Sequence, residues 1–283
     1  MLDILLDTLL DTLKMLPVLY LAYLLMEFLE KKAGEKINTA VAKVGVAGPV
    51  LGSLLGIIPQ CGFSSAIAGF YAAGIVTLGT LMSVFLSTSD EMLPILLSSN
   101  VNVMQIVKIL IFKFVGAVIV GFVIDSFLRI INKQRNITAD EIHEFCEREN
   151  CECEENIFLS ALKHTAKVIL LIFVVSLVLN FVMSIDSVKS FITTSVKSIP
   201  VVGEFSAALI GLIPNCSSSV IITNLFISNV ITPSQMMAGL FANAGVGLLV
   251  LFRLNRNVKK NLLITVILYV VSVLLGLAVG LLW

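Results

Sequence analysis

Charged residues are scarce in this chain of 283 residues: they make up 13% of it, whereas hydrophobic residues make up 58%. A soluble globular domain usually carries about 25% charged residues. A water-soluble fold could not cover so many apolar side chains, so the composition predicts that the chain folds in a lipid bilayer. The formal net charge is zero, which gives no positive surface field for binding nucleic acid.

Histidine is also scarce, and several sequence signals are lacking. There are two histidines, and the segment MLDILLDTLLD at the N-terminus lacks the basic region of a signal peptide, so we expect it to remain in the mature protein. The five cysteines are an odd number spread over apolar and acidic stretches, which does not fit a secreted disulfide framework, and we expect reduced thiols. No phosphate-binding loop of the form G-x-x-x-x-G-K-[ST] is present, and no cofactor is expected.

Long apolar runs dominate the chain instead. Four of them have the length of one spanning helix, about 20 residues: Thr12–Phe28, Ile106–Ile131, Ala166–Ile185 and Asn261–Trp283. Two others, at 44–89 and 205–252, contain no charged residue and are about twice as long as one straight helix needs. Each of these two must therefore fold back in the membrane, and Pro59 and Pro214 indicate where.

The two long runs are copies of each other. The segment GIIPQCGFSS, which begins at Gly56, aligns without a gap with GLIPNCSSSV, which begins at Gly211. The offset, 211 − 56 = 155, also pairs more distant positions: Gly48 with Gly203, Pro59 with Pro214, Cys61 with Cys216, Ser64 with Ser219, Thr77 with Thr232 and Met82 with Met237. Matches of Pro, Cys and Thr in a single register indicate an internal duplication, which is common in transporters.

Basic residues set the expected orientation of the two halves. They gather at 31–43, at 129–135 and at 253–260, whereas the N-terminal segment carries aspartates. Because loops rich in Lys and Arg stay on the cytoplasmic side, both termini are expected outside, and each half then crosses the membrane an odd number of times. We predict an all-α polytopic membrane protein with two inverted repeats, each containing broken or re-entrant helices, and about ten membrane segments in all. The predicted parts are a first membrane repeat at 1–131, an acidic cytoplasmic linker with cysteines at 132–164 and a second membrane repeat at 165–283.

Small residues recur every four positions at the start of each long run. The first run has Gly48, Gly52 and Gly56, and the second has Gly203, Ala207 and Gly211 at the matching positions. Small residues at this spacing let helix backbones approach closely in lipid, so we expect both stripes to pack against another helix.

Two lysines interrupt the apolar run at 106–131. Lys108 and Lys113 both lie in its first part. A long lysine side chain near a helix end commonly carries its ammonium to the membrane interface while the stem covers apolar surface. We expect both lysines at the outer interface.

Each long run contains a Pro-x-Cys sequence, at which one helix is expected to end and another to begin. Such breaks persist at membrane depth only where protein or a watery cavity covers them, and the N-terminus of the new helix favours anions. A cysteine there is biased towards the thiolate, and two thiolates facing one cavity would bind a soft metal or trivalent arsenic. The candidates are the breaking prolines Pro59 and Pro214 and the binding residues Gln60, Cys61, Ser64, Asn215, Cys216 and Ser219. The alternative is that both cysteines are small apolar fillers at a tight turn.

Two acids end the first charge-free run. Asp90 and Glu91 follow Ser89, whereas the second run has Gly245 and Val246 at the matching positions. Ionisable groups beside so long an apolar segment are functional candidates, and either acid could bind a cation or exchange a proton. The alternative is that the stretch from residue 87 to residue 91 is a solvated helix end at the outer surface.

The second run has polar residues of its own. Asn224 and Asn243 could line a transport path, although hydrogen bonding between helices is the simpler role. The tetrapeptide Thr232-Pro233-Ser234-Gln235 fits a capping box with Pro at the first helical position, which predicts a helix start there.

The predicted linker holds a stretch from His143 to Glu155 that combines thiols, acids and one imidazole. Cys146, Cys151 and Cys153 could capture a metal, but their spacing matches no zinc-finger pattern. Runs of charge are commonly solvated, so we favour a solvated acidic linker over a metal site.

The two long runs also resemble a known family. The segments GIIPQCGFSSAIAGFYAAGIVTLGTLMSVFLSTSDEMLPILL and GLIPNCSSSVIITNLFISNVITPSQMMAGLFANAGVGLLVLFRLN are similar to those of a family of ten-helix heavy-metal exporters, which is related to organoarsenical permeases and is also labelled as manganese transporters. The resemblance implies efflux of a heavy metal or metalloid by a secondary active transporter. Arsenic prefers thiolate ligands and manganese prefers oxygen ligands, so the two labels imply Cys61 with Cys216, or Asp90 with Glu91, as the metal-binding residues.

Two other functions stay open. One is transport of a small anion held at helix N-termini. The other is an intramembrane hydrolase, which needs a base beside its nucleophile, whereas His143 and His164 fall in or beside the inner loop. We therefore predict no enzyme activity and an integral plasma-membrane protein of the bacterial inner-membrane type. Its expected partners are a small inorganic or organometallic substrate and the lipid bilayer, with no nucleic acid and with a homodimer left open.

Overall fold

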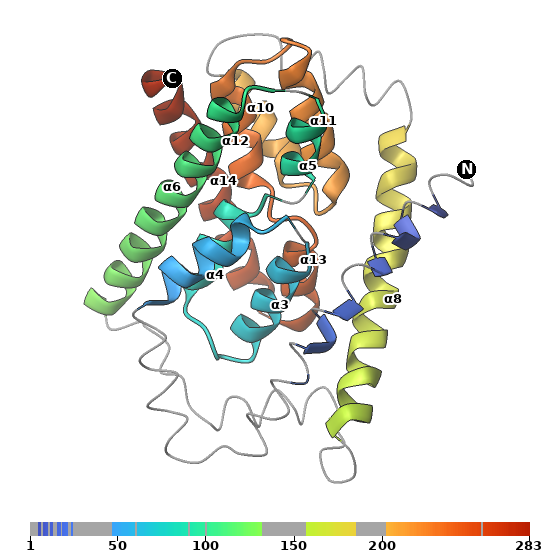
Figure 1. Cartoon of the computed structure of the whole chain (residues 1–283). Helices are drawn as coiled ribbons and strands as arrows, with labels where there is room; N and C mark the ends of the chain where they lie inside the picture. The colour runs from blue at the N-terminus through green and yellow to red at the C-terminus, as the bar shows by residue number, and fades with distance from the viewer. Residues whose placement is uncertain are drawn as a thin grey trace.

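The structure is a computed structural model that describes residues 47–59, 61–89, 91–99, 101–131, 157–184, 202–255 and 257–283, together with single positions between 5 and 24. The helices of these residues are Ala47–Ile57, α3 (Cys61–Ala72), α4 (Leu78–Ser87), α5 (Met92–Ser98), α6 (Val103–Ile130), α8 (Ile157–Ser184), α10 (Val202–Gly211), α11 (Cys216–Ile227), α12 (Pro233–Ala242), α13 (Gly247–Leu254) and α14 (Val258–Leu282). Every regular element within the described residues is a helix, so the predicted all-α class is confirmed (Figure 1).

Threonine caps explain where the chain resumes a helix after each fold-back. Thr77 precedes α4 and Thr232 precedes α12, and each Oγ1 accepts a hydrogen bond from the amide three residues further on, at 3.1 and 3.2 Å. At α12 the amide of Thr232 also donates to Gln235 Oε1 at 3.0 Å, with Pro233 in the first turn. The predicted capping box is therefore confirmed.

Residues with left-handed backbone conformation explain where α3 and α11 end. Gly74 follows α3 with φ 78°, and Asn229 follows α11 with φ 55°. The amide after each of them donates to the carbonyl five residues back, at 2.8 and 2.9 Å. This is the Schellman arrangement, which favours Gly or Asn because their left-handed conformation costs little.

The helix boundaries repeat with the same offset that aligns the two apolar runs. α3 and α11 begin 155 residues apart, at 61 and 216, and α4 and α12 begin at 78 and 233. α5 and α13 begin at 92 and 247, and α6 and α14 at 103 and 258. Ala47–Ile57 and α10 begin at 47 and 202. Local conformation thus follows the sequence match element by element.

The corresponding helices α6 and α14 run in opposite directions. The end of α14 lies at the start of α6, where the rings of Trp283 and Phe112 are 6.4 Å apart. The start of α14 lies at the end of α6, where Lys260 and Asp125 line one cavity. In Figure 1 the C-terminus accordingly lies near the upper end of α6, far from the lower end.

The N-terminal segment and α8 also run in opposite directions. Tyr20 donates from its hydroxyl to the carbonyl of Phe158 at 3.4 Å, at the start of α8. Asn180, near the end of α8, donates from Nδ2 to Thr8 Oγ1 at 2.8 Å. The helical positions between residues 5 and 24 therefore lie along α8 with the opposite chain direction.

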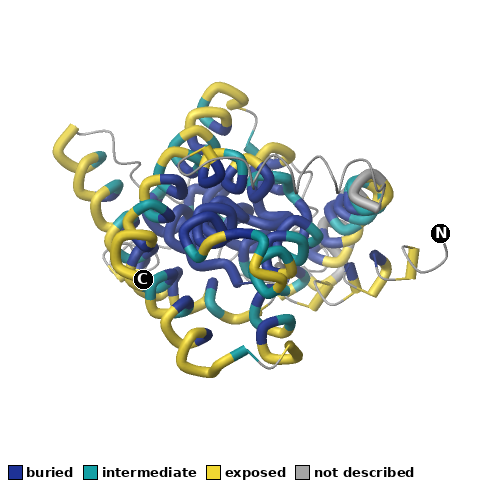
Figure 2. The backbone as a smooth tube through the Cα atoms, turned by 90° about the horizontal axis from the view of Figure 1, so that it is seen from above, coloured by how far each residue is buried: buried dark blue, intermediate teal, exposed yellow. Residues whose placement is uncertain are grey.

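The centre of the molecule is built from α4 and α12, and long helices surround it. Phe85 of α4 and Phe241 of α12 are almost fully buried, and α4 packs on α6 while α12 packs on α14. Figure 2 shows this buried centre and the exposed outward faces of the peripheral helices. Large apolar side chains such as Ile119, Val174 and Leu274 are exposed on these faces, as lipid-facing positions are.

Within the described residues, four segments are long and apolar enough to cross a membrane: Leu78–Ser98, Val103–Ile130, Pro233–Leu254 and Val258–Leu282. Each of the last three has a boundary within a few residues of a boundary of a predicted apolar run. The helix α8 begins at Ile157, earlier than the predicted Ala166. The first and third are not single helices, because α4–α5 and α12–α13 are each interrupted. Residues 132–156 lie outside the described part of the chain, so the interpretations of Cys146, Cys151 and Cys153 stay predictions.

The glycine stripes pack closely, as predicted. A Cβ on Gly56 would lie 2.8 Å from the carbonyl oxygen of Val84 on α4. A Cβ on Gly211 would lie 2.1 Å from the carbonyl oxygen of Gly239 on α12. Both stripes therefore bring a helix backbone onto the first part of an interrupted span.

Candidate functional site

Both interrupted spans break in the interior of the protein. α4 ends at Ser87 and α5 begins at Met92, while α12 ends at Ala242 and α13 begins 155 residues after α5. Ser87 and Ser89 are 0% and 2% exposed. The alternative, a solvated helix end from residue 87 to residue 91, is therefore wrong for residues 87–89, because neighbouring helices cover this turn, whereas Asp90 lies outside the described residues. The amide of Ser89 donates to the carbonyl of Gly56 at 3.1 Å, which fixes the turn against the first glycine stripe.

Asn243 shapes the break of the second span. It is the C-cap of α12 and is 1% exposed. Its Oδ1 accepts from the amide of Gly245 at 3.0 Å, and Gly245 has a positive φ of 54°. Asparagine side chains commonly accept hydrogen bonds from the backbone of such turns. The Oδ1 of this candidate binding residue is therefore already used to hold the turn.

The Pro-x-Cys sequences separate helices, as predicted. Ala47–Ile57 ends before Pro59 and α3 begins at Cys61, while α10 ends before Pro214 and α11 begins at Cys216. Cys216 is 6% exposed and belongs to the apolar core. The side chain of Cys61 lies outside the described residues, so the predicted thiolate pair stays a prediction.

The second Pro-x-Cys break is held by a network that the sequence analysis missed. Asn215 is 4% exposed, and its Nδ2 donates to Asn180 Oδ1 at 2.6 Å. Ser217 donates to the same oxygen, and Asn180 in turn donates to Thr8. The available signal was Asn180 itself, a single asparagine in an apolar helix, because asparagine side chains in lipid form hydrogen bonds between helices.

Each Pro-x-Cys helix packs against the interrupted span of the other half. α3 lies on α13, and α11 lies on α5, so the pairing is crosswise (Figure 1). At the start of α13, a Cβ on Gly247 would lie 2.7 Å from the carbonyl oxygen of Ser64 and 2.9 Å from the ring of Phe85. The first turn after one proline break thus lies directly at the end of the break in the other half.

Lys113 of α6 reaches the point where the two interrupted spans meet. Its side chain is 0% exposed. Its Nζ donates to the carbonyl of Thr88 at 2.5 Å and to that of Leu240 at 2.8 Å, and lies 5.9 Å from the ring centre of Phe241. Thr88 caps α4 and Leu240 lies in the last turn of α12, so the ammonium is placed at the negative ends of two helices, one from each half.

The expectation that Lys113 extends to the membrane interface is therefore wrong. α6 begins at Val103, which places Lys113 about 15 Å along the helix at 1.5 Å per residue. That is near the middle of a hydrocarbon core about 30 Å thick, and the side chain cannot leave it. Lys108 is exposed as expected, with its Nζ 5.9 Å from the ring centre of Trp283.

A protein-family profile described as "Putative, 10TM heavy-metal exporter" matches residues 3–209 of the chain. The chain belongs to this exporter family. The matched range includes the first Pro-x-Cys break, the first interrupted span, α6 and α8. No curated protein and no solved structure gives a match. The family and the apolar helices together make the chain an integral membrane protein of a transporter family.

The remaining predicted site residues of the exporter fall in different places. Ser64 and Ser219 are each 1% exposed in the first turns of α3 and α11, whereas Asn224 is exposed. Glu91 is half-buried at the start of α5. Gln60 and Asp90 lie outside the described residues. Among the residues that are described, no three His, Cys, Asp or Glu side chains gather as metal ligands would.

Among the described residues of each half of the exporter, one carboxyl group that the sequence analysis missed is buried. Asp125 of α6 accepts from Thr77 Oγ1 at 2.7 Å and from the amide of Gly79 at 2.8 Å, at the start of α4. It lines a cavity of about 310 Å³ together with Tyr71 and Lys260. A single acid near the end of a spanning run was the available signal.

Glu204 is the buried carboxyl of the second half. It lies in the first turn of α10, and its Oε1 is 2.8 Å from Ser234 Oγ at the start of α12. With the offset of 155, Ser234 corresponds to Gly79, while Gly280 corresponds to Asp125. The same place in both halves therefore holds one carboxyl, which is supplied by α6 in the first half and by α10 in the second.

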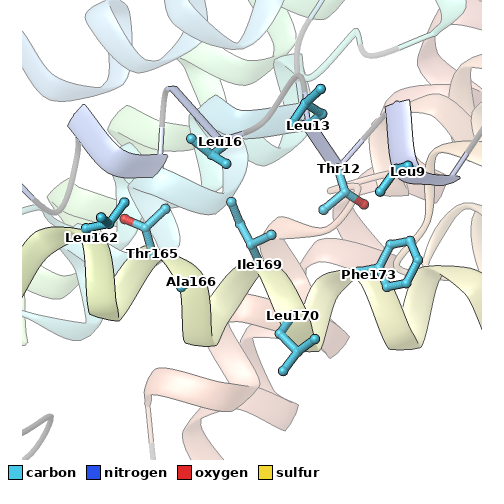
Figure 3. A pocket seen from close by; sticks show the side chains of 10 residues that line it. All are labelled: Leu9, Thr12, Leu13, Leu16, Leu162, Thr165, Ala166, Ile169, Leu170 and Phe173. Carbon is cyan, nitrogen blue, oxygen red and sulfur yellow. The ribbon is translucent and has the colours of Figure 1, made fainter.

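A further cavity of about 300 Å³ lies between the N-terminal segment and α8 (Figure 3). Among the described residues its lining is apolar apart from two hydroxyls, those of Thr12 and Thr165. Each hydroxyl donates to the carbonyl four residues back at 2.7 Å. The described part of the lining is therefore suited to a hydrocarbon chain.

Proposed function

We propose that this family member is a secondary active transporter that exports a heavy metal or metalloid through two inverted membrane repeats, at 1–131 and 165–283, joined by the linker at 132–164. Membership of the exporter family supports the class of cargo. Helix boundaries that recur after 155 residues, and the opposite directions of α6 and α14, support the inverted arrangement of about ten segments.

The observation that carries the proposal is the pair of interior breaks between α4 and α5 and between α12 and α13. Secondary transporters commonly bind cargo and coupling ions where discontinuous helices expose helix ends and unwound backbone near the membrane midplane. Here the breaks occur once in each half and meet at Lys113. The crosswise packing of α3 on α13 and of α11 on α5 adds the two Pro-x-Cys turns to the same region.

Two chemistries can be built from the residues around these breaks. A soft cargo would bind the thiolates of Cys61 and Cys216, with Gln60, Asn215, Ser64 and Ser219 around them. A hard cation such as manganese would bind oxygen atoms of Asp90, Glu91, Asn224 and Asn243. We favour the soft cargo, such as trivalent arsenic or an organic arsenical, because the cysteines occur in both halves and the acids in only one. Asp90 or Glu91 would then serve as the coupling group.

One observation favours a small anion as an alternative cargo. The Nζ of Lys113 lies at the meeting point of the two breaks. In its ammonium form this group would attract an anionic cargo, most strongly in a site of low dielectric constant. Its test is therefore part of the same experiment.

The proposed location is the plasma membrane, of the bacterial inner-membrane type, with both termini outside. The support is the basic residues at 31–43, 129–135 and 253–260, which would place these three segments in the cytoplasm. An intramembrane hydrolase is not proposed, since the family is one of exporters.

The experiment is a sensitivity and accumulation panel in bacterial cells with and without the protein. The probes are arsenite, methylarsenite, antimonite, cadmium, manganese and the oxyanions arsenate and phosphate. We expect the expressing cells to tolerate trivalent arsenic and to retain less of it. The control is the Lys113→Met variant, present in the membrane in an equal amount, which should give less tolerance. Equal tolerance and equal retention of every probe would contradict the proposal, and an effect confined to the oxyanions would favour the anion alternative.

A further inference from the structure

Ser234 has two oxygen neighbours but only one hydrogen to give them. Its Oγ lies 2.8 Å from Glu204 Oε1 and 2.9 Å from the carbonyl oxygen of Gly276 on α14. A hydroxyl carries a single donor hydrogen, whereas a main-chain carbonyl and an ionised carboxylate can only accept. If Glu204 were ionised, the hydroxyl hydrogen of Ser234 could serve only one of these two contacts, and the other would bring two oxygen atoms together without a hydrogen between them.

We propose that Glu204 is a proton-binding site of the transporter and carries a proton in this conformation. The carboxylic acid then donates to Ser234 Oγ, and Ser234 donates to Gly276, so that both short contacts become hydrogen bonds with their own hydrogen. The sequence analysis did not single out Glu204. It lies on α10, whereas Asp90 and Glu91 follow α4 in the other half of the chain.

Within the described part of the chain, the surroundings of Glu204 offer no counter-ion. Its side chain is 5% exposed, and Oε2 has no hydrogen-bond partner. The helices packed on α10 are α11, α12 and α14. α12 carries no titratable residue, and α11 carries Cys216 alone. α14 has Tyr269, whose hydroxyl donates to the carbonyl of Phe205, and Lys259 and Lys260 in its first turn, about 24 Å along the helix from Gly276. An ionised carboxyl in this place would be buried without a partner, which is costly.

Asp125 shows that the other half satisfies its carboxyl differently. Each oxygen of Asp125 has a donor with its own hydrogen, namely the hydroxyl of Thr77 and the amide of Gly79. The hydroxyl of Thr80 lies 2.9 Å from Thr77 Oγ1 and can donate to it, so the set of hydrogens is complete with an ionised carboxylate. Asp125 is therefore a matched control for Glu204 within the same chain.

The position of Glu204 suits a coupling role, and this step rests on the proposed function. Ser234 lies in the first turn of α12, and Leu240 in its last turn binds Lys113 at the central break. A shift of α12 relative to α10 and α14 would part Glu204 from Ser234 and admit water. The carboxylic acid could then give its proton to that water, and the carboxylate would be hydrated rather than buried.

The first test needs no cargo. The full-length chain in liposomes at neutral pH is measured by infrared spectroscopy for the carbonyl stretch of a protonated carboxyl, with glutamate labelled by ¹³C. We expect a band that shifts with the label, is lost in Glu204→Gln and is retained in Asp125→Asn. A spectrum without such a band, or a band unchanged by Glu204→Gln, would overturn the proposal.

A second measurement keeps the test decisive if the Glu204→Gln variant does not fold. Dicyclohexylcarbodiimide enters apolar regions and adds to carboxyl groups only when they are protonated. Wild-type protein treated at neutral pH should carry the adduct on the peptide with Glu204 and lack it on the peptide with Asp125. The reverse pattern, or no adduct on Glu204, would count against the proton site.

The coupling role is tested separately in liposomes with an imposed pH gradient and arsenite or manganese as the probe. In Glu204→Gln we expect counterflow exchange of the probe to persist while its acceleration by the pH gradient is lost. Unchanged acceleration would remove the coupling role and leave the proton site standing. Absence of transport in the wild type would count against the proposed function and leave the infrared result unaffected.

Discussion

The Nζ of Lys113 lies 2.8 Å from the carbonyl oxygen of Leu240, 127 residues away in the chain. One side chain of the first half is thus bonded to the backbone of the second. The same Nζ donates to the carbonyl of Thr88, the C-cap of α4, so the first helix of each interrupted span ends beside Lys113. The arrangement uses the free carbonyls that every helix leaves at its C-terminus.

Lys113→Met should strongly destabilise the protein. The methionine fills a similar volume but leaves the carbonyls of Thr88 and Leu240 without their donor, and each unsatisfied buried group costs about 1–3 kcal/mol. Circular dichroism during thermal unfolding in detergent should show a clear loss. Lys108→Met, in the exposed part of the same helix, should stay within about 0.5 kcal/mol of wild type. Equal melting of both variants would contradict the central role of Lys113.

Gly79→Ala should be damaging where Gly116→Ala is not. A Cβ at residue 79 would lie 2.3 Å from the carbonyl oxygen of Gly121 and 2.4 Å from Cγ of Asp125, and such overpacking costs about 1–3 kcal/mol. At residue 116 the nearest atoms are 3.4 Å away, and alanine favours the helix by about 0.5–1 kcal/mol. Thermal unfolding of the two variants side by side tests the close contact of α4 and α6. A stable Gly79→Ala would show that the helices are further apart than described.

Asn229 and Gly74 should be exchangeable with each other but not with alanine. Both have positive φ, which costs a residue other than Gly or Asn about 1–2 kcal/mol. Asn229→Gly and Gly74→Asn should therefore keep wild-type melting, whereas Asn229→Ala should lower it. A neutral Asn229→Ala would mean that this turn is not left-handed in the membrane.

The acids of the first half should matter for transport, and the linker should not. We expect Asp90→Asn or Glu91→Gln to abolish export of the cargo found in the panel, because a coupling group must change or balance charge. Shortening the stretch from His143 to Glu155 should leave export near wild type. Efflux from preloaded cells, at matched protein levels, gives both answers. Full activity in both acid variants, or an inactive shortened linker, would reverse this ranking.

Replacing Cys61 and Cys216 together by serine should separate the two classes of cargo. Serine keeps the size but removes the soft thiolate ligand, so resistance to trivalent arsenic should be lost while handling of manganese changes little. Uptake of arsenite and of manganese into everted vesicles measures both. Normal arsenic export by the double variant would make the cysteines packing residues, in line with the burial of Cys216 in the apolar core.

The sequence predicts the breaks of this fold better than its contacts. Pro59 and Pro214 mark helix ends because proline cannot continue a helix, and the capping box at Thr232 marks a start for an equally local reason. The break after Ser87 has no proline or glycine of its own. Its burial depends on α6 and α12, which lie near it only in the folded chain, so the sequence left a solvated helix end open as the alternative.

The site residues that were missed or misplaced share one cause, which is that their partners are distant in the sequence. Lys113, Asn180 and Glu204 look isolated in apolar sequence, and their partners lie 127, 172 and 30 residues away. Hydropathy predicts the length of a membrane-spanning helix but does not show which of its faces packs against another helix. For Lys113 the depth along α6 did contain the answer, since about 15 Å from the helix start is too deep for an ammonium to reach water.

The crosswise pairing of α3 with α13 has a consequence for synthesis. When α3 leaves the ribosome its partner does not yet exist, because α13 ends at Leu254 whereas α3 ends at Ala72. At about 5–20 residues per second, the delay is roughly 10–40 s. During that time the faces of α3 and α5 that pack on α13 and α11 have no native neighbour, in a bilayer that also holds other nascent chains. The first half must therefore wait in the membrane for the second, and this interval is when insertion factors would have most to protect.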